Sequence, residues 1–250
     1  MPQLLPAGPK IVLMDREYSL DDLADDGDLD LRNIGGIAWE AILSICKSKR
    51  LRLYHVKIPS LSGVERLRDT SRLSMVWANQ ISSLDSVFQM TWLTSLSVSD
   101  FRLLKSIEGI GKLECLESLH LSGNLGSLSP PLRMDSIRPI SALQNLRELT
   151  VQNVRLENDD ITFLAQLPKL NRLVLSSTFD WKQFAFLAKR LNGQLEVPIT
   201  ASTKMKMPCR SCGGSLSLFI GKRRPLLCES CDRKRFEKLT RQFEEQVAVS

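Results

Sequence analysis

The chain has 250 residues, of which 43% are hydrophobic and 6% aromatic, so it can bury a large core. Its N-terminal stretch is broken by Pro2, Pro6 and Pro9 and reaches acid at Asp15. From this pattern we expect neither a signal peptide nor a membrane span, and we expect a soluble cytoplasmic protein.

The net charge of +6 belongs to the C-terminal tail. Residues 201–250 contain 11 Lys and Arg against 5 Asp and Glu, and the two classes balance in residues 1–200. Residues 15–30 are strongly acidic by contrast. Because runs of like charge usually remain hydrated, we interpret residues 1–25 as a solvated acidic N-terminal cap.

Eight short pairs of the form apolar-x-apolar recur along residues 26–200. Their first members are Leu29, Leu51, Leu73, Leu96, Leu119, Leu149, Leu173 and Leu195, at steps of 22, 22, 23, 23, 30, 24 and 22 residues. This period is typical of a solenoid, in which each unit buries its apolar face only against its neighbours. We therefore expect eight parallel strands, centred on residues 30, 52, 74, 97, 120, 150, 174 and 196.

Between the strands, apolar residues recur at every third position, as in Leu104, Ile107, Ile110, Leu113 and Leu116. This spacing favours a short helix or 3₁₀ turn on the convex side, because side chains three apart in a tight helix point the same way. The step of 30 residues contains three prolines, which predict a loop that leaves the solenoid: Pro130, Pro131 and Pro139.

The stretch LESLHLSGN, with Leu116, Leu119, Leu121 and Asn124, resembles the leucine-rich repeat pattern L-x-x-L-x-L-x-x-N. The resemblance implies an α/β solenoid with a parallel sheet on its concave side. It also implies that a protein partner binds on that concave surface. The asparagine position of the pattern holds Asn124 only once, so a continuous asparagine ladder is not expected.

Side chains that flank and separate each apolar pair point out of the sheet. One such row, here called the first row, comprises Asp28, Arg50, Arg72, Ser95, Ser118, Glu148, Arg172 and Gln194. The second and third rungs concentrate large residues that often dominate interface energies, and we name this set the arginine–aromatic patch: Arg50, Arg52, Tyr54, His55, Arg72 and Trp77.

We interpret the arginine–aromatic patch as a site for a protein partner. The alternative is a surface charge ladder, in which Asp28 pairs with Arg50 and Asp30 with Arg52, at about 0 to 1 kcal/mol per pair. An enzyme is not expected. The chain has two histidines, and no carboxylate on the adjoining rungs would orient His120 as a base.

Four of the six cysteines form Cys209-x2-Cys212 and Cys228-x2-Cys231, with fifteen residues between the pairs. Two such pairs can bind one tetrahedral Zn²⁺, and four cysteine ligands leave no open position, so the predicted zinc is structural. A redox disulfide is the alternative, although no thioredoxin-like context surrounds either pair. We interpret Cys46 and Cys115 as small core residues.

The segments SLSLFI and PLLC around GKRR predict a β-hairpin, and the chain from Cys231 onward has a helical pattern. Knuckle, hairpin and helix together resemble a treble-clef zinc finger, and a zinc ribbon is the neighbouring possibility. We assign residues 209–250 to this module. Residues 201–208 look like a polar linker between two cores, so loss of metal should unfold the tail selectively.

Six basic residues decorate the tail: Lys222, Arg223, Arg224, Arg233, Lys234 and Arg235. They favour an alternative function, nucleic-acid binding through the module with the solenoid as scaffold. Interleaved Glu229, Asp232 and Glu237 dilute this positive charge. The preferred interpretation is a non-enzymatic adaptor that binds a protein on its concave face.

Overall fold

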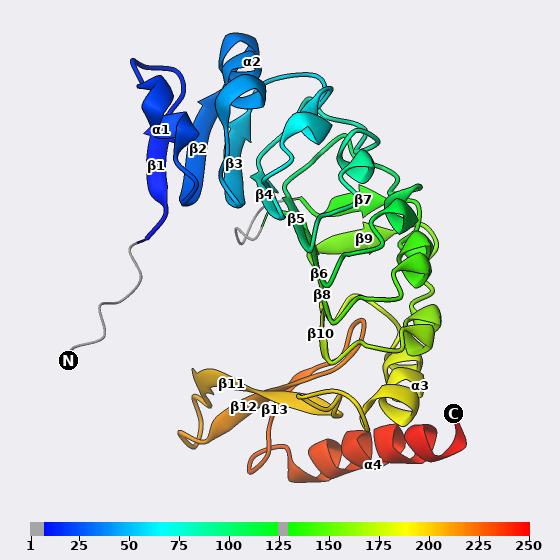
Figure 1. Cartoon of the computed structure of the whole chain (residues 1–250). Helices are drawn as coiled ribbons and strands as arrows, with labels where there is room; N and C mark the ends of the chain where they lie inside the picture. The colour runs from blue at the N-terminus through cyan, green and yellow to red at the C-terminus, as the bar shows by residue number, and fades with distance from the viewer. Residues whose placement is uncertain (1–7, 125–129) are drawn as a thin grey trace, which may run out of the picture.

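The computed structural model describes residues 8–124 and 130–250, which form an arc with strands on its inner side and helical turns outside (Figure 1). One parallel sheet of eight strands lines the inner side. Its strands, in hydrogen-bonded order, are β1 (Lys10–Leu13), β2 (Asp28–Ile34), β3 (Arg50–Val56), β4 (Arg72–Val76), β5 (Ser95–Ser99), β6 (Ser118–Ser122), β8 (Glu148–Gln152) and β10 (Arg172–Leu175).

The apolar pairs align strand by strand. Leu29 lies opposite Leu51, which lies opposite Leu73, and the same register continues through Leu96 and Leu119. It reaches β8 and β10 without a slip. The leucines of this ladder from β2 to β8 are each 1% exposed. Seven of the eight predicted strands, and the solenoid itself, are therefore confirmed.

The prediction of an eighth strand at residue 196 is wrong. Leu195 follows α3 (Trp181–Leu191) so closely that its N–H donates to Leu191 O at 3.0 Å, as in a helix end, and Val197 is 78% exposed. The eighth strand is β1, inside the segment that the sequence assigned to the acidic cap. In β1, Lys10 lies opposite Leu29, where the other strands have a leucine. The strand therefore does not match the pattern of apolar pairs.

Short helical elements return the chain on the outer side, as the spacing of three predicted. They are α1 (Leu20–Ala24), α2 (Gly36–Ile45), α3 and the 3₁₀ turns η1 (Val64–Arg66), η2 (Val87–Gln89), η3 (Ile110–Lys112), η4 (Arg138–Ala142) and η5 (Thr162–Gln166). Part of the expected proline loop, residues 125–129, lies outside the described residues. Just beyond it, β7 (Leu132–Met134) pairs in parallel with β9 (Val154–Leu156).

The sheet ends in a repeated backbone corner. Asn33, His55, Trp77, Asp100 and Asn153 all have a positive φ between 48° and 63°, each near the end of its strand. Asn, Asp and His tolerate this left-handed conformation, whereas a bulky residue such as Trp rarely adopts it. The corner at Trp77 is thus the exceptional one.

The tail folds as a three-stranded antiparallel sheet and a helix, namely β11 (Ser202–Pro208), β12 (Ser215–Phe219), β13 (Leu226–Cys228) and α4 (Arg233–Val249). The predicted hairpin and helix are confirmed. The predicted linker at residues 201–208 is wrong, because β11 occupies it. Its polar composition resembles that of a linker because β11 is held by backbone pairing with β12 while most of its side chains stay exposed.

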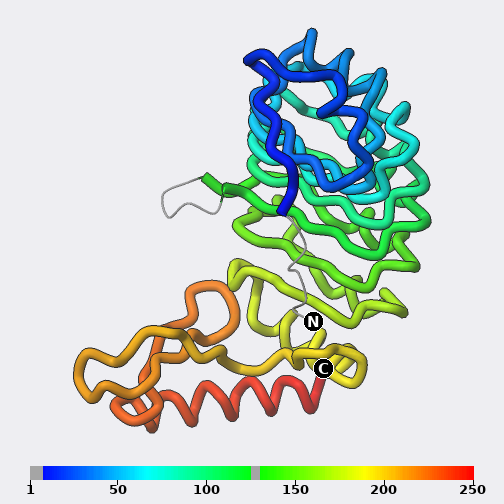
Figure 2. The backbone as a smooth tube through the Cα atoms, turned by 60° about the vertical axis from the view of Figure 1, so that its left-hand side comes forward, coloured from blue at the N-terminus to red at the C-terminus, as the bar shows by residue number. Residues whose placement is uncertain are grey.

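The module packs across the C-terminal end of the solenoid, with α4 against α3 (Figures 1 and 2). Lys222 N–H donates to Phe179 O at 2.7 Å, and the Arg224 guanidinium lies 4.4 Å from the Trp181 ring. Gly221, at φ 104°, approaches so closely that a Cβ would lie 2.5 Å from that of Trp181. The expectation of two separate cores is therefore wrong, because the module continues the last repeat.

The two remaining cysteines differ. Cys46, which directly follows α2, is buried as expected, and burial raises the pKa of its thiol. Cys115 is exposed, so its assignment to the core is wrong. Across residues 8–124 and 130–250, no helix has the length and apolar character needed to cross a bilayer.

Leu119 provides a test of the ladder. Replacing it with Ala should lower the free energy of unfolding by about 2 to 5 kcal/mol, because it opens a cavity in a packed core. Thr150→Ala, on the outward face of the adjoining strand, should change it by less than about 0.5 kcal/mol. Chemical denaturation measures both, and equal effects would contradict the assignment of Leu119 to the buried ladder.

Candidate functional site

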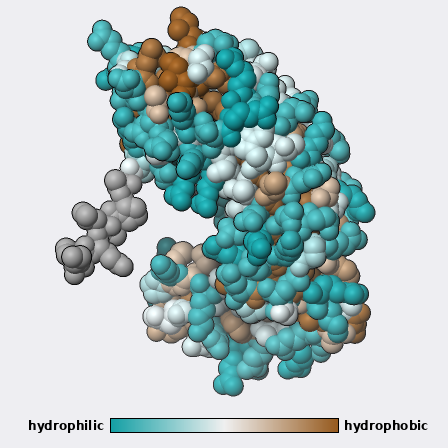
Figure 3. Space-filling model, in the orientation of Figure 1, coloured by the Kyte–Doolittle hydropathy of each residue, from teal (hydrophilic) through white to brown (hydrophobic). Residues whose placement is uncertain are grey.

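The arginine–aromatic patch comes together on β3 and β4. Because the two strands pair in register, Arg50 lies opposite Arg72, and Tyr54 lies opposite Val76, the residue before Trp77. All six predicted members therefore occupy neighbouring rungs of the concave face. Figure 3 shows this face as a hollow between the N-terminal repeats and the C-terminal module, bordered largely by hydrophilic residues.

A buried carboxylate organises the patch. Asp30 is 1% exposed, and its Oδ2 accepts hydrogen bonds from Arg32 Nη2 at 2.7 Å and Arg52 Nη1 at 3.1 Å. Both guanidinium carbons lie 5.5 Å from the centre of the Tyr54 ring. Arg32 was absent from the predicted site, although its place on the neighbouring rung of the same row as Tyr54 could have indicated it.

Trp77 and His55 form a stacked pair. Their ring centres lie 3.8 Å apart with an interplanar angle of 10°, and Tyr54 meets Trp77 edge-on at 5.9 Å. Asn33 Oδ1 accepts a hydrogen bond from His55 Nδ1 at 2.7 Å. Burial, with a contribution from Lys57, lowers the pKa of His55, which favours the neutral ring.

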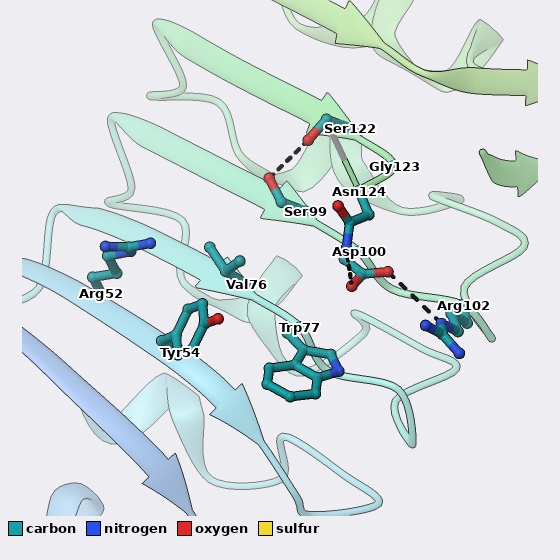
Figure 4. A pocket seen from close by; sticks show the side chains of 10 residues that line it. All are labelled: Arg52, Tyr54, Val76, Trp77, Ser99, Asp100, Arg102, Ser122, Gly123 and Asn124. Atoms are coloured by element: carbon teal, nitrogen blue, oxygen red, sulfur yellow. Dashed lines mark hydrogen bonds and ion pairs between the residues drawn. The ribbon is translucent and has the colours of Figure 1, made fainter. Parts of the chain in front are cut away.

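The aromatic end of the patch borders a cavity of about 540 Å³, shown close up in Figure 4. Besides Arg52, Tyr54 and Trp77, Asp100 and Arg102 line it. Asp100 is 7% exposed, and Arg102 Nε lies 3.8 Å from its carboxylate. Neither residue was predicted, because both follow the strand β5 in a loop whose direction the apolar pattern does not indicate.

The alternative charge ladder is also present in part. Arg50 Nη1 lies 3.2 Å from Asp28 Oδ2, and Arg52 binds Asp30 as described. Arg72, between Arg50 and Ser95 on the first row, has no ion pair with any residue of the described ranges. The ladder therefore accounts for Arg50 and Arg52 but leaves Arg72 unexplained.

The second candidate site is the cysteine cluster. The sulfur atoms of Cys209, Cys212, Cys228 and Cys231 all lie within 4.8 Å of one another. The knuckle between the first two is closed by Gly213 N–H donating to Cys209 O at 2.9 Å, with Gly213 at φ 73°. Asp232 Oδ2 accepts from Cys228 N at 3.0 Å and so joins the second pair to α4.

The cluster has the dimensions of a tetrahedral metal site. Four sulfurs about 2.3 Å from one ion lie about 3.8 Å apart, and here the Cys212–Cys228 and Cys209–Cys231 sulfur pairs lie at 3.5 and 3.9 Å. Backbone N–H groups of Ser211 and Cys212 lower the pKa of Cys209 to about 6, whereas hydrogen bonding to Cys212 and Cys209 raises that of Cys231 to about 12. The four thiols could hold a metal ion.

The six basic residues of the module do not gather into one surface. Lys222, Arg223 and Arg224 lie on the hairpin turn beside α3, where Arg224 stacks on Trp181. Arg233, Lys234 and Arg235 open α4 at the opposite end of the hairpin, beside the cysteines, and Arg233 pairs with Glu237 at 2.8 Å. Two of the six thus already have internal partners.

Asp30 and Asp28 test the organising role of the buried carboxylate. Asp30→Asn should cost about 1.5 to 3 kcal/mol of stability, because two charge-assisted hydrogen bonds weaken out of water. Asp28→Asn, whose side chain is 43% exposed, should cost less than about 1 kcal/mol. Thermal and chemical unfolding measure both, and equal losses would show that Asp30 does not organise its arginines.

Comparison with known proteins gives little further identification. No protein-family model matches the chain, and no curated protein matches it. Among solved structures it is similar to internalin C2 of Listeria monocytogenes, with 17% identity, a TM-score of 0.46, and coverage of 62% of this chain and 63% of that one. The chain thus spans less than two thirds of that structure. At this level of likeness, the fold assignment rests on the strand register itself.

Proposed function

We propose that the chain is a non-enzymatic interaction protein that binds a protein partner on the concave face of its N-terminal repeats. The arginine–aromatic patch is the proposed contact surface. The observation that carries this proposal is the conformation of Trp77, a bulky residue held at φ 60° on the open side of the sheet.

The surrounding structure maintains that conformation. Trp77 N–H donates to Ser99 O at 3.0 Å and its carbonyl accepts from Val56 N at 3.0 Å, so both neighbouring strands fix the backbone. A left-handed non-glycine residue costs about 1 to 3 kcal/mol, and such costs concentrate at functional sites. Its ring also gains rigidity from stacking on His55. A rigid Trp and Tyr beside guanidinium groups is the composition of an interface hot spot.

A catalytic role has less support. His120, on β6, lies opposite Ser97 and Thr150 in register, and neither residue can supply a carboxylate to orient it. Burial lowers its pKa, which favours the neutral imidazole. The chemistry concentrated around Tyr54 and Trp77 is that of recognition, with aromatic area and fixed positive charge.

We also propose that the cysteine cluster binds one structural zinc ion. Thiolates suit Zn²⁺, and four of them leave no position for a substrate or a water molecule. A reducing compartment such as the cytoplasm would keep the thiols available. The module has few buried apolar side chains, with Phe219, Leu227 and Phe243 the main ones, so metal binding should supply much of its stability.

A partner recovered by affinity capture and mass spectrometry tests the binding surface. Replacing Tyr54 and Trp77 together with Ala should weaken its binding by at least about tenfold, because truncated hot-spot residues cost about 2 kcal/mol or more. The matched control is Thr150→Ala with Gln152→Ala, on β8 of the same sheet and outside the cavity beside Trp77. The alternative function predicts that the chain binds nucleic acid and that charge reversal at Arg223, Lys234 and Arg235 weakens this binding, whereas replacing Tyr54 and Trp77 does not. That result would replace the proposed function with the alternative one.

Metal analysis and hydrogen exchange test the zinc proposal. Freshly purified protein should carry about one equivalent of zinc, and Cys212→Ser should lose it, because three ligands cannot close the site. Since the module packs on α3, amides of α3 should then exchange faster, while those of β3 to β5 should not. Cys115→Ser, at an exposed position outside the cluster, is the control. Less than half an equivalent of zinc would count against the assignment.

A further inference from the structure

Arg72 differs from the other arginines of its row. On the first row, Arg50 is paired with Asp28 at 3.2 Å and Arg172 with Glu148 at 2.9 Å. Arg72 is exposed and has neither an ion pair nor a side-chain hydrogen bond within residues 8–124 and 130–250. Its guanidinium is therefore available to an anion from outside the chain.

Three serines next to Arg72 also keep their hydroxyls available. Ser74, Ser95 and Ser97 make no side-chain hydrogen bond in the described part of the chain, whereas Ser99 and Ser122 bind each other at 2.8 Å. Ser95 lies opposite Arg72, and Ser97 lies opposite Ser74. These four side chains stand on a grid of about 4.8 by 6.6 Å and border one cavity of about 200 Å³.

We propose that Arg72, Ser74, Ser95 and Ser97 form a binding site for a carboxylate side chain of a protein partner. This inference rests on the proposed function and specifies the partner as an acidic segment. A guanidinium with neighbouring hydroxyl donors matches the acceptor oxygens of a carboxylate. The site is built from two adjacent strands whose register is fixed by the buried leucines Leu73 and Leu96.

The charges around Arg72 favour one carboxylate over a polyanion. Asp28, Arg50 and Arg52 also line the cavity of about 200 Å³, and a second cavity beside Arg72, of about 240 Å³, is lined by Glu117, Arg147 and Glu148. These other charges are already paired: Arg50 with Asp28, Arg52 with Asp30, Arg147 with Glu117, and Glu148 with Arg172. One unpaired positive charge matches one carboxylate, whereas a nucleic acid presents a phosphate at every nucleotide.

The apolar end of the same strand defines the rest of the segment. From Arg72 to Trp77 the chain advances five residues, or about 16 Å along the strand. There the 540 Å³ cavity beside Tyr54 and Trp77 can accept an apolar side chain. In an extended segment only residues an even number of positions apart face the same way, so the partner should carry an acidic residue and a large apolar residue four or six positions apart.

Selection from a library of random dodecapeptides tests this site. The whole chain serves as bait, and enriched peptides are measured by fluorescence anisotropy against the wild type, Arg72→Gln and the double variant Ser95→Ala with Ser97→Ala. Arg172→Gln is the matched control, because that arginine shares the first row but is already paired. Circular dichroism melting verifies that each variant folds.

The expected result is enrichment of peptides with Asp or Glu four or six positions from an aromatic or aliphatic residue. Their affinity should fall at least about tenfold in Arg72→Gln, by less in the serine variant, and remain unchanged in Arg172→Gln. Three outcomes would overturn the proposal. The enriched peptides could lack an excess of acidic residues, they could bind Arg72→Gln as tightly as the wild type, or the selection could enrich no sequence. A single-stranded RNA that binds the wild type more tightly than the peptides and loses affinity in Arg72→Gln would also overturn it.

The outcomes separate this inference from the proposed function. If the enriched peptides lose affinity with Tyr54→Ala and Trp77→Ala but not with Arg72→Gln, the concave face binds protein and the carboxylate site is wrong. If neither change affects them, both proposals fail.

Discussion

The register of the buried leucines is the constraint on which the rest of the molecule depends. A single repeat cannot bury its own apolar face, so each strand must align with the next one along the arc. The same alignment places Arg50 opposite Arg72 and Ser74 opposite Ser97 on the open side. A slip of one residue would turn these groups into the core. The positions of the polar side chains on the concave face are thus determined by the packing of the leucines behind the sheet.

Two local features then distinguish the N-terminal rungs from the others. A buried Asp30 holds two guanidinium groups beside Tyr54, and the strand-end corner at the next rung presents Trp77. The middle rungs β5 and β6 have serine at five of the six corresponding outward positions, with His120 at the sixth, so they offer hydroxyl groups but little contact area. The strands therefore share one backbone geometry but present different side chains. The large aromatic and basic groups of the concave face are concentrated near its N-terminal end.

Sequence patterning predicted the interior well because leucine spacing and burial share one period, and it predicted the cysteine cluster because its geometry follows from two short knuckles. It missed β1 and β11 for a common reason, since both are edge strands whose alignment depends on backbone pairing more than on apolar side chains. The contact of Gly221 with Trp181 could not be predicted, because it joins segments whose approach depends on the whole tail. Arg32, Asp100 and Arg102 were missed because loops and neighbouring rungs bring them to the site.

Because the strands follow one another along the sheet, the number of repeats determines the distance between its two ends. Four strand-to-strand steps separate β4 from β10, beside which the C-terminal module is seated, and each step is about 4.8 Å. Removing one central repeat would shorten the opening between Arg72 and the module by about 5 Å while leaving both ends chemically intact. The number of repeats thus determines the size of the object that can span from one end of the arc to the other.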